Sequence, residues 1–272
     1  MTAHNVSICI HVWFVDDKLC AVIDRAYSGK LQSFRGYMSL QGREIILAGG
    51  SGGIGSSVAE QLRGEGARLV VSYLHNRERA ERFAPAASIL QADLSDSESR
   101  DRLLKAAPAM YGLVVFAGDP ARGLDANAAM QRSHAANYMG PILLAREAAS
   151  RMKNAETPGS IVLLSTMQAN ALFPGSTFYA AQKAALQHAA LILAKEMRGP
   201  SGIRVNVVSP GITAAGMAEA SIASGKYDHF IAQGVISRFG HADDVARAIR
   251  FFLEPDNYVT GQVLCVDGGI TL

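Results

Sequence analysis

The sequence predicts an α/β fold, a single doubly wound parallel sheet of about seven strands with helices on both faces. Two observations predict it. From residue 43 onward, short apolar runs rich in β-branched residues alternate with helical patterns, which is the order of repeated βαβ units. The runs are apolar throughout, as expected of parallel strands that crossover helices bury on both faces. Strands are predicted at 45–48, 69–73, 88–92, 113–116, 161–165, 205–209 and 263–266.

Composition bounds the class of protein. The chain has 272 residues, 49% of them hydrophobic and 18% charged, which fits one large globular domain or two small ones. A formal net charge of +2 gives no basic stripe, so we expect no nucleic-acid partner and no membrane partner. Three cysteines are too few for a disulfide framework and favour the cytoplasm. No apolar stretch reaches the ~20 residues of a membrane span.

The first 37 residues do not follow the alternation of strands and helices. Residues 6–15 and 19–24 could pair as a small hairpin. Alternatively, residues 1–37 precede the true start of the folded chain and need not fold at all. Either way, we expect the main domain to span residues 38–272.

A glycine-rich turn, Gly49 to Gly55, follows the first predicted strand and precedes apolar residues at helical spacing. In such a strand–turn–helix unit, glycines let the backbone approach a pyrophosphate, and the helix N-terminus offers free N–H donors. The alternative is a flexible Gly/Ser loop, which does not account for the position between a strand and an amphipathic helix.

Tyr179 and Lys183 lie four residues apart in a predicted helix over 177–197, so their side chains share one face. A free phenol has a pKa of about 10. A neighbouring ammonium stabilises the phenolate and lowers that pKa, as a general acid needs near neutral pH. The pair therefore indicates proton transfer, the alternative being a half-buried tyrosine beside a solvated lysine.

With these two features in hand, residues 40–272 resemble the short-chain dehydrogenase/reductase family, whose members have a single Rossmann-type domain. The pattern is most similar to that of 3-oxoacyl-(acyl-carrier-protein) reductase-like members. Gly49, Gly53 and Gly55 match the family's three-glycine turn, although Ala48 stands where threonine is usual. The other matching motifs follow in the family's order: Asp93-Leu94, Asn137, Tyr179 with Lys183, Asn206 to Gly211, Thr260-Gly261-Gln262, and Val266 to Gly269.

The resemblance implies a catalytic set of Asn137, Thr166, Tyr179 and Lys183, without a metal. Tyr179 would exchange a proton with the carbonyl oxygen. Lys183 would lower the pKa of Tyr179 and hold the nicotinamide ribose. Asn137 would hold a water that links Lys183 to solvent. The hydroxyl 13 positions before the tyrosine would polarise the carbonyl, and it belongs to Thr166 where serine is usual. Ser165 beside it is the alternative.

The resemblance also implies a nicotinamide dinucleotide as cofactor. No acidic side chain follows the second strand until Glu78, so nothing would repel a 2′-phosphate, which Arg77, His75 or Ser72 could bind. We therefore expect NADP, with NAD as the alternative, although Gly52 stands where NADP-preferring members often carry a basic residue. The expected cofactor-binding residues are Gly49, Ser51, Gly52, Gly53, Ile54, Gly55, Tyr73, His75, Asn76, Arg77, Asp93, Leu94, Ala117, Gly118, Tyr179, Lys183, Pro210, Gly211, Ile212 and Thr213.

Two departures from the family pattern affect the cofactor site. Val115-Phe116 replaces the Asn-Asn that usually precedes Ala-Gly, so two bracing amides are missing. Ala215 replaces the threonine that usually contacts the nicotinamide amide, with Thr213 two places nearer. Because of Val115-Phe116 and of Thr166 in place of serine, a cofactor-binding sensor or structural protein without turnover is an alternative. A reductase of carbon–carbon double bonds is a third, against which the three-residue Tyr-to-Lys spacing argues.

Residues 214–236 resemble the family's mobile substrate lid. Met167, Phe173, Met217, Phe230 and Ile231 are candidates for an apolar substrate pocket, or are ordinary core. The partner is expected to be a small-molecule carbonyl compound, and a 3-oxoacyl thioester is one candidate. Small residues along 177–197 and the resemblance together predict a homo-oligomer with two-fold symmetry, a dimer or a tetramer.

Overall fold

The computed structural model describes residues 39–84 and 86–272, so both interpretations of residues 1–37 lie outside the described residues. Residues Leu40–Leu272 form one compact unit. Its strands are β1 (Glu44–Ala48), β2 (Arg68–Tyr73), β3 (Ala87–Gln91), β4 (Met110–Val115), β5 (Gly159–Leu164), β6 (Ile203–Pro210) and β7 (Val263–Val266). All seven strands predicted from the sequence are confirmed, with ends that differ by up to three residues.

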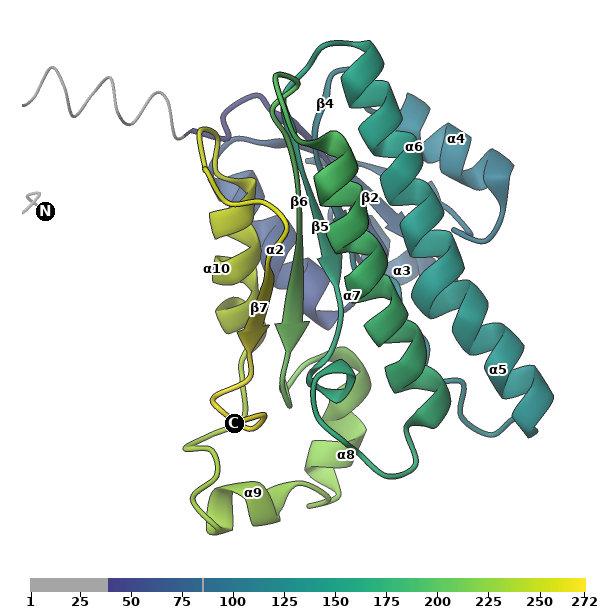
Figure 1. Ribbon diagram of the computed structural model, residues 1–272, viewed down its shortest axis with the longest axis vertical. Coiled ribbons are helices and arrows are strands. Elements are labelled where there is room, and N and C mark those ends of the chain that lie inside the picture. Colours follow the sequence, from purple (N-terminus) through teal and green to yellow (C-terminus); the bar gives the residue numbers. More distant parts are fainter. Residues whose placement is uncertain (1–38, 85) are drawn as a thin grey trace, which may run out of the picture. The chain divides into compact units, whose positions relative to one another are not determined.

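The strands form one parallel sheet in the order β3-β2-β1-β4-β5-β6-β7 (Figure 1). The predicted doubly wound α/β fold is therefore confirmed. The chain reverses its direction of travel across the sheet between β1 and β4. In such sheets the crevice outside the carboxyl ends of the strands, at this switch point, is where ligands bind.

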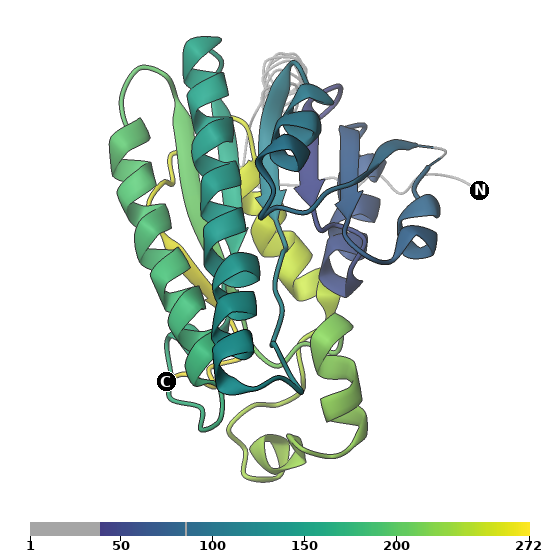
Figure 2. The ribbon, with the colours of Figure 1, turned by 90° about the vertical axis from the view of Figure 1, so that its right-hand side faces the viewer.

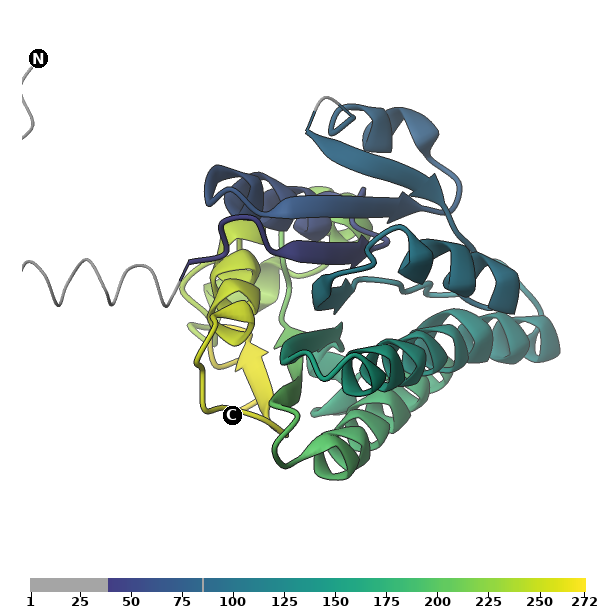
Figure 3. The ribbon, with the colours of Figure 1, turned by 90° about the horizontal axis from the view of Figure 1, so that it is seen from above.

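Helices cover both faces of the sheet. They are α2 (Gly53–Gly64), α3 (Arg77–Glu81), α4 (Ser97–Lys105), α5 (Ala126–His134), α6 (Gly140–Asn154), α7 (Thr177–Met197), α8 (Glu219–Ala223), α9 (Asp228–Ala232) and α10 (Ala242–Leu253). Helices α6 and α7 pack side by side on one face, and α2 and α10 on the other (Figure 3). Within the described residues, no helix is long and apolar enough to cross a membrane.

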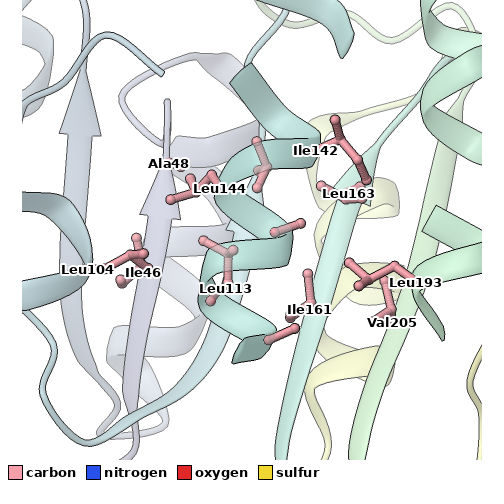
Figure 4. Close-up of a cluster of buried hydrophobic side chains, with 14 of the residues drawn as sticks. Ile46, Ala48, Leu104, Leu113, Ile142, Leu144, Ile161, Leu163, Leu193 and Val205 are labelled. Atoms are coloured by element: carbon pink, nitrogen blue, oxygen red, sulfur yellow. The ribbon is translucent and has the colours of Figure 1, made fainter. Parts of the chain in front are cut away.

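Each central strand supplies side chains to two cores because its residues alternate between faces. Ile46 and Leu113 join the core under α6 and α7, which also contains Leu144 and Leu193 (Figure 4). Their strand neighbours, such as Ile45, belong to the core under α2 and α10. Burial on both faces is the reason why the strands are continuous apolar runs in the sequence.

The remaining short elements lie at the carboxyl end of the sheet or interrupt the long helices. A π-helical turn, η1 (Ala135–Met139), connects α5 to α6. The 3₁₀ turns η2 (Met167–Ala169) and η3 (Gly216–Ala218) follow β5 and β6. Helices α8 and α9 stand beyond the strand ends (Figures 1 and 2), so the predicted lid 214–236 is a pair of short helices.

Candidate active site

The carboxyl ends of the strands border a cavity of about 1010 Å³. Of the site residues predicted from the sequence, all but Asn137 and Arg77 line it. Those that do are Gly49, Ser51, Gly52, Gly53, Ile54, Gly55, Tyr73, His75, Asn76, Asp93, Leu94, Ala117, Gly118, Thr166, Tyr179, Lys183, Pro210, Gly211, Ile212 and Thr213. Residues from seven separate segments of the chain therefore meet in one place.

The hydroxyl beside Tyr179 belongs to Thr166. Thr166 lies two residues after β5, Tyr179 stands in the first turn of α7, and the Thr166 side chain is near enough to lower the pKa of the Tyr179 hydroxyl. Ser165 instead faces the side of α7, where its Oγ donates to the Lys183 carbonyl at 3.2 Å and accepts from Gln187 Nε2 at 2.9 Å. The alternation of side chains along an extended segment separates these neighbours.

Lys183, one helical turn after Tyr179, is buried, with 2% of its surface exposed. Its Nζ donates to the carbonyl of Ala117 at 2.9 Å and to that of Leu164 at 2.8 Å. These carbonyls come from the ends of β4 and β5, which are adjacent strands. Burial lowers the pKa of Lys183 to about 7.

The phenol of Tyr179 is a weaker acid than the sequence led us to expect. Burial raises its pKa to about 12, and the hydrogen bond with Thr166 only partly opposes this shift. Helical spacing does place Lys183 on the same side of α7. Its ammonium, however, is held by two backbone carbonyls, and the cost of burying a phenolate dominates.

Asn137 holds the loop after β4 rather than lining the cavity. It is fully buried in η1, where its Oδ1 accepts from the Asp119 N–H at 2.9 Å and its Nδ2 donates to the Asp119 carbonyl at 2.7 Å. Nδ2 also donates to Ser133 Oγ at 3.0 Å. The expected water contact of Asn137 therefore cannot use the amide hydrogens, which are already committed.

The residues after β2 are arranged differently from the expectation. Arg79 lines the cavity with His75 and Asn76, whereas Arg77 is directed to solvent and pairs with Glu81 at 2.7 Å. Asn76 caps α3 by accepting from the Arg79 N–H at 2.9 Å, which fixes where the helix begins. Since successive helical residues diverge by about 100°, this start turns Arg77 and Arg79 to different sides.

Ser72 is not available to a ligand. Its Oγ is buried and accepts a hydrogen bond from the Gly49 N–H at 3.0 Å. Gly49 has a φ of +76°, a backbone conformation that favours glycine, so a larger residue at position 49 would be strained. The Ser72 hydroxyl therefore supports a turn that depends on glycine. This corrects the expectation that Ser72 could bind a phosphate.

The glycine turn fits a pyrophosphate. Helix α2 begins at Gly53 without a side-chain cap and without an acidic residue in its first turn, and residues 53–55 line the cavity. Backbone donors and the positive end of the helix dipole therefore face the cavity. Gly50, which the sequence analysis did not single out, packs against Gly55: a Cβ on Gly55 would lie 2.6 Å from Gly50 Cα.

The first residues of the lid contact the glycine turn, and the chain just after the lid pairs with the chain at its start. A Cβ on Gly53 would lie 2.6 Å from the Gly216 nitrogen. At the other end, Gly240 donates to the Ile212 carbonyl and accepts from Ala214, each at 2.8 Å. Of the predicted pocket residues, Met167, Phe173 and Met217 line the cavity, while Phe230 of α9 packs on Phe173 with ring centroids 6.5 Å apart.

Within the described residues, no group of three or more His, Cys, Asp or Glu side chains could hold a metal ion. Charged cavity residues that carry no motif and were missed by the sequence analysis include Asp119, Arg122 and Lys226. For Asp119 and Arg122, the signal that could have found them is their position four and seven residues beyond the end of β4.

Comparisons with known proteins identify the family. Residues 48–271 match the family profile described as "Enoyl-(Acyl carrier protein) reductase". An NADPH-dependent aldehyde reductase-like protein of Arabidopsis thaliana is 32% identical over 85% of this chain and 95% of its own length. A solved short-chain type dehydrogenase/reductase from Mycobacterium ulcerans is 27% identical and superposes with a TM-score of 0.78 over 86% of this chain and 91% of its own. This chain belongs to the short-chain dehydrogenase/reductase family.

As a member of this family, the chain is an oxidoreductase with a Rossmann fold that acts on alcohols and carbonyl compounds and binds a nicotinamide dinucleotide. A 7α-hydroxysteroid dehydrogenase, solved with NADH and a 7-oxo bile acid, is also similar, with 26% identity and a TM-score of 0.78 over 86% of this chain and 96% of its own. Family members therefore differ in cofactor and substrate, so these finer properties depend on the residues of the individual site.

Proposed function

We propose that this protein is an NADP-preferring carbonyl reductase in which Tyr179 is the general acid. The observation that carries the proposal is that Thr166, Tyr179 and the buried Lys183 line one cavity, with Thr166 near enough to Tyr179 to lower the pKa of its hydroxyl. Two hydroxyls at one point can both contact a single carbonyl oxygen. Lys183 places a titratable amine within the same enclosed site.

Each residue has one task in the reduction. A bound nicotinamide dinucleotide supplies the hydride that reaches the carbonyl carbon. Thr166 donates a hydrogen bond to the carbonyl oxygen as negative charge develops there, and Tyr179 transfers its proton to that oxygen to complete the alcohol. Protonated Lys183 favours the phenolate that Tyr179 then becomes. With a pKa of about 7, Lys183 can also give up and regain a proton at neutral pH.

Asn137 is a positioning residue in this scheme. By holding both the N–H and the carbonyl of Asp119, it fixes the chain directly after Gly118. A Cβ on Gly118 would lie 3.4 Å from Asn137 Oδ1 and 3.6 Å from Lys183 Nζ. Asn137 thereby sets the position of the Ala117 carbonyl, which is one of the two acceptors of Lys183.

We infer a preference for NADP from the residues after β2. The cavity wall there carries His75, Asn76 and Arg79 and no acid that would repel a 2′-phosphate. A guanidinium binds phosphate well because its donors match two oxygens at once. The similarity to an NADPH-dependent reductase supports the same choice, and Arg79 replaces Arg77 as the proposed phosphate ligand.

The carbonyl, rather than a carbon–carbon double bond, is the proposed reducible group. The family profile carries an enoyl reductase description, but Tyr179 and Lys183 are separated by three residues, whereas enoyl reductases of this fold usually have a wider spacing. A 3-oxoacyl thioester stays among the candidate substrates.

We also propose a cytoplasmic homo-oligomer that uses the small residues of α7 for close packing.

The test follows NADPH and NADH oxidation with simple ketones and β-keto thioesters, using NADPH deuterated on the transferred position. We expect turnover, a higher kcat/KM with NADPH, and deuterium on the carbinol carbon of the product. Tight NADPH binding without turnover of any carbonyl compound would favour the sensor alternative. Transfer of deuterium to the β-carbon of an enoyl thioester, giving the saturated thioester, would favour reduction of a double bond.

A further inference from the structure

Besides Arg79, two cations that line the active-site cavity form no ion pair among the described residues. Arg122 follows β4, Lys226 lies between α8 and α9, and both line the cavity. Among the described residues, neither side chain forms an ion pair, and the contact shown for Lys226 places its Nζ 5.4 Å from the centroid of the Tyr227 ring. Two separate segments therefore direct uncompensated positive charge into the same space.

The acids that line the cavity are already committed. Asp119 accepts from Arg132 Nε at 2.7 Å and from the Ala121 N–H at 2.7 Å, so it does not neutralise Arg122 three residues away. Asp93 accepts from the Ser95 N–H and hydroxyl at 2.8 and 2.7 Å. The lid acids Glu219 and Asp228 do not line the cavity. Asp93 keeps its charge, but the lining carries Arg79, Arg122, Arg132 and Lys226 against Asp93 and Asp119, so the charge of the lining is net positive.

These cations come from other segments of the chain than the expected phosphate ligands of the cofactor. His75 and Arg79 follow β2, toward the edge of the sheet where the adenosine would bind, and the glycine turn follows β1. Arg122 lies in the loop after β4, and Lys226 lies in the lid between α8 and α9, so neither belongs to the segments that follow β1 and β2. The expected phosphates of the cofactor therefore belong to other residues.

We propose that the substrate carries an anionic group, a carboxylate or a phosphate, which Arg122 and Lys226 bind while Tyr179 acts on the carbonyl. This inference rests on the proposed function. Both residues are exposed at the rim of the cavity, and charge-assisted hydrogen bonds to an anion there are stronger than neutral ones. Phe173 and Met217 offer apolar contacts for the body of such a molecule. The anion is either the ketone's own carboxylate or the phosphates of a coenzyme A-type thioester.

Two matched pairs of substrates distinguish these sources. One pair is a keto acid and its methyl ester; the other is a 3-oxoacyl coenzyme A and the same acyl group on N-acetylcysteamine. The kcat/KM of each is measured with wild type, Arg122→Gln and Lys226→Gln. Lys153→Gln serves as the control because it removes one exposed charge from the end of α6, outside the cavity.

We expect the anionic member of at least one pair to be preferred by about tenfold, since charge-assisted hydrogen bonds are stronger than neutral ones. Each cavity substitution should reduce that preference at least threefold and leave the neutral member unchanged. Lys153→Gln should retain the full preference. The dissociation constant of NADPH, measured by fluorescence, should be the same in all four proteins.

Equal use of both members of each pair by the wild type, or a preference that survives both substitutions, would overturn the proposal. So would a weaker NADPH affinity in the variants with an unchanged substrate preference, because the cations would then serve the cofactor. Efficient turnover of the neutral members alone would leave the carbonyl reductase assignment intact. Absence of turnover with all four compounds would contradict that assignment itself.

Discussion

Gly53 of the glycine turn supports Gly216 of the lid: a Cβ on Gly53 would lie 2.6 Å from the Gly216 nitrogen and 3.0 Å from Ala215 Cβ. At this position glycine is required by the lid as well as by a pyrophosphate. Gly52 differs, because a Cβ there would meet no atom closer than 3.7 Å. Two adjacent glycines of one motif thus have separable roles.

Gly53→Ala should displace the start of the lid, at a cost of about 1–3 kcal/mol for overpacking. We expect faster tryptic cleavage after Lys226, measured without cofactor, while Gly52→Ala is cleaved at the wild-type rate. Equal cleavage of the two variants would show that Gly53 does not support the lid.

Lys183 should make stability depend on pH. Its pKa of about 7 in the folded protein lies below the ordinary value of 10.5, so the unfolded chain binds more protons between these limits. The free energy of unfolding should therefore rise with pH from about 7 to 10, by up to about 1.4 kcal/mol per unit from this group. Urea denaturation of Lys183→Met should lack this rise, whereas Lys195→Met, exposed on the same helix, should keep it. If the free energy of unfolding depended on pH in the same way in all three proteins, the lowered pKa of Lys183 would be contradicted.

The two neighbouring hydroxyls should separate activity from stability. Thr166→Ala should lower kcat about 10²-fold, as for loss of one donor at a developing oxyanion, and Thr166→Ser should restore most of it. Ser165→Ala should cost about 1 kcal/mol of stability through its lost hydrogen bonds, with little change in kcat. A larger loss of kcat in Ser165→Ala than in Thr166→Ala would reverse the assignment.

The C-terminus of α10 is held by polar groups from the sheet, away from the cavity. Arg204 donates to the carbonyls of Phe252 and Glu254 at 2.8 and 2.9 Å, and Tyr111 donates to that of Leu253 at 2.9 Å. Because hydrogen bonds from a charged group contribute about 1.5–3 kcal/mol, Arg204→Met should lower the free energy of unfolding by about that amount. Calorimetry should show the lower Tm, with KM for NADPH unchanged. An unchanged Tm would mean that solvent replaces these bonds without loss.

Local sequence patterns predicted the strands, the span of α7 and the glycine turn because each depends on neighbouring residues. The partners of Lys183 could not be predicted in this way, since the Ala117 and Leu164 carbonyls meet only when β4 and β5 pair. The choice of Arg79 over Arg77 depends on the residue at which α3 begins. The commitment of Asn137 to Asp119 likewise requires the tertiary fold.

The central claim is that Tyr179 provides the proton for reduction of a carbonyl. Tyr179→Phe removes one hydroxyl and keeps the ring, so the decisive measurement is the single-turnover rate of NADPH oxidation by this variant beside its NADPH dissociation constant. We predict a rate lower by about 10²–10⁴-fold, the usual contribution of a general acid, with unchanged NADPH affinity. An undiminished rate in the variant would contradict the account.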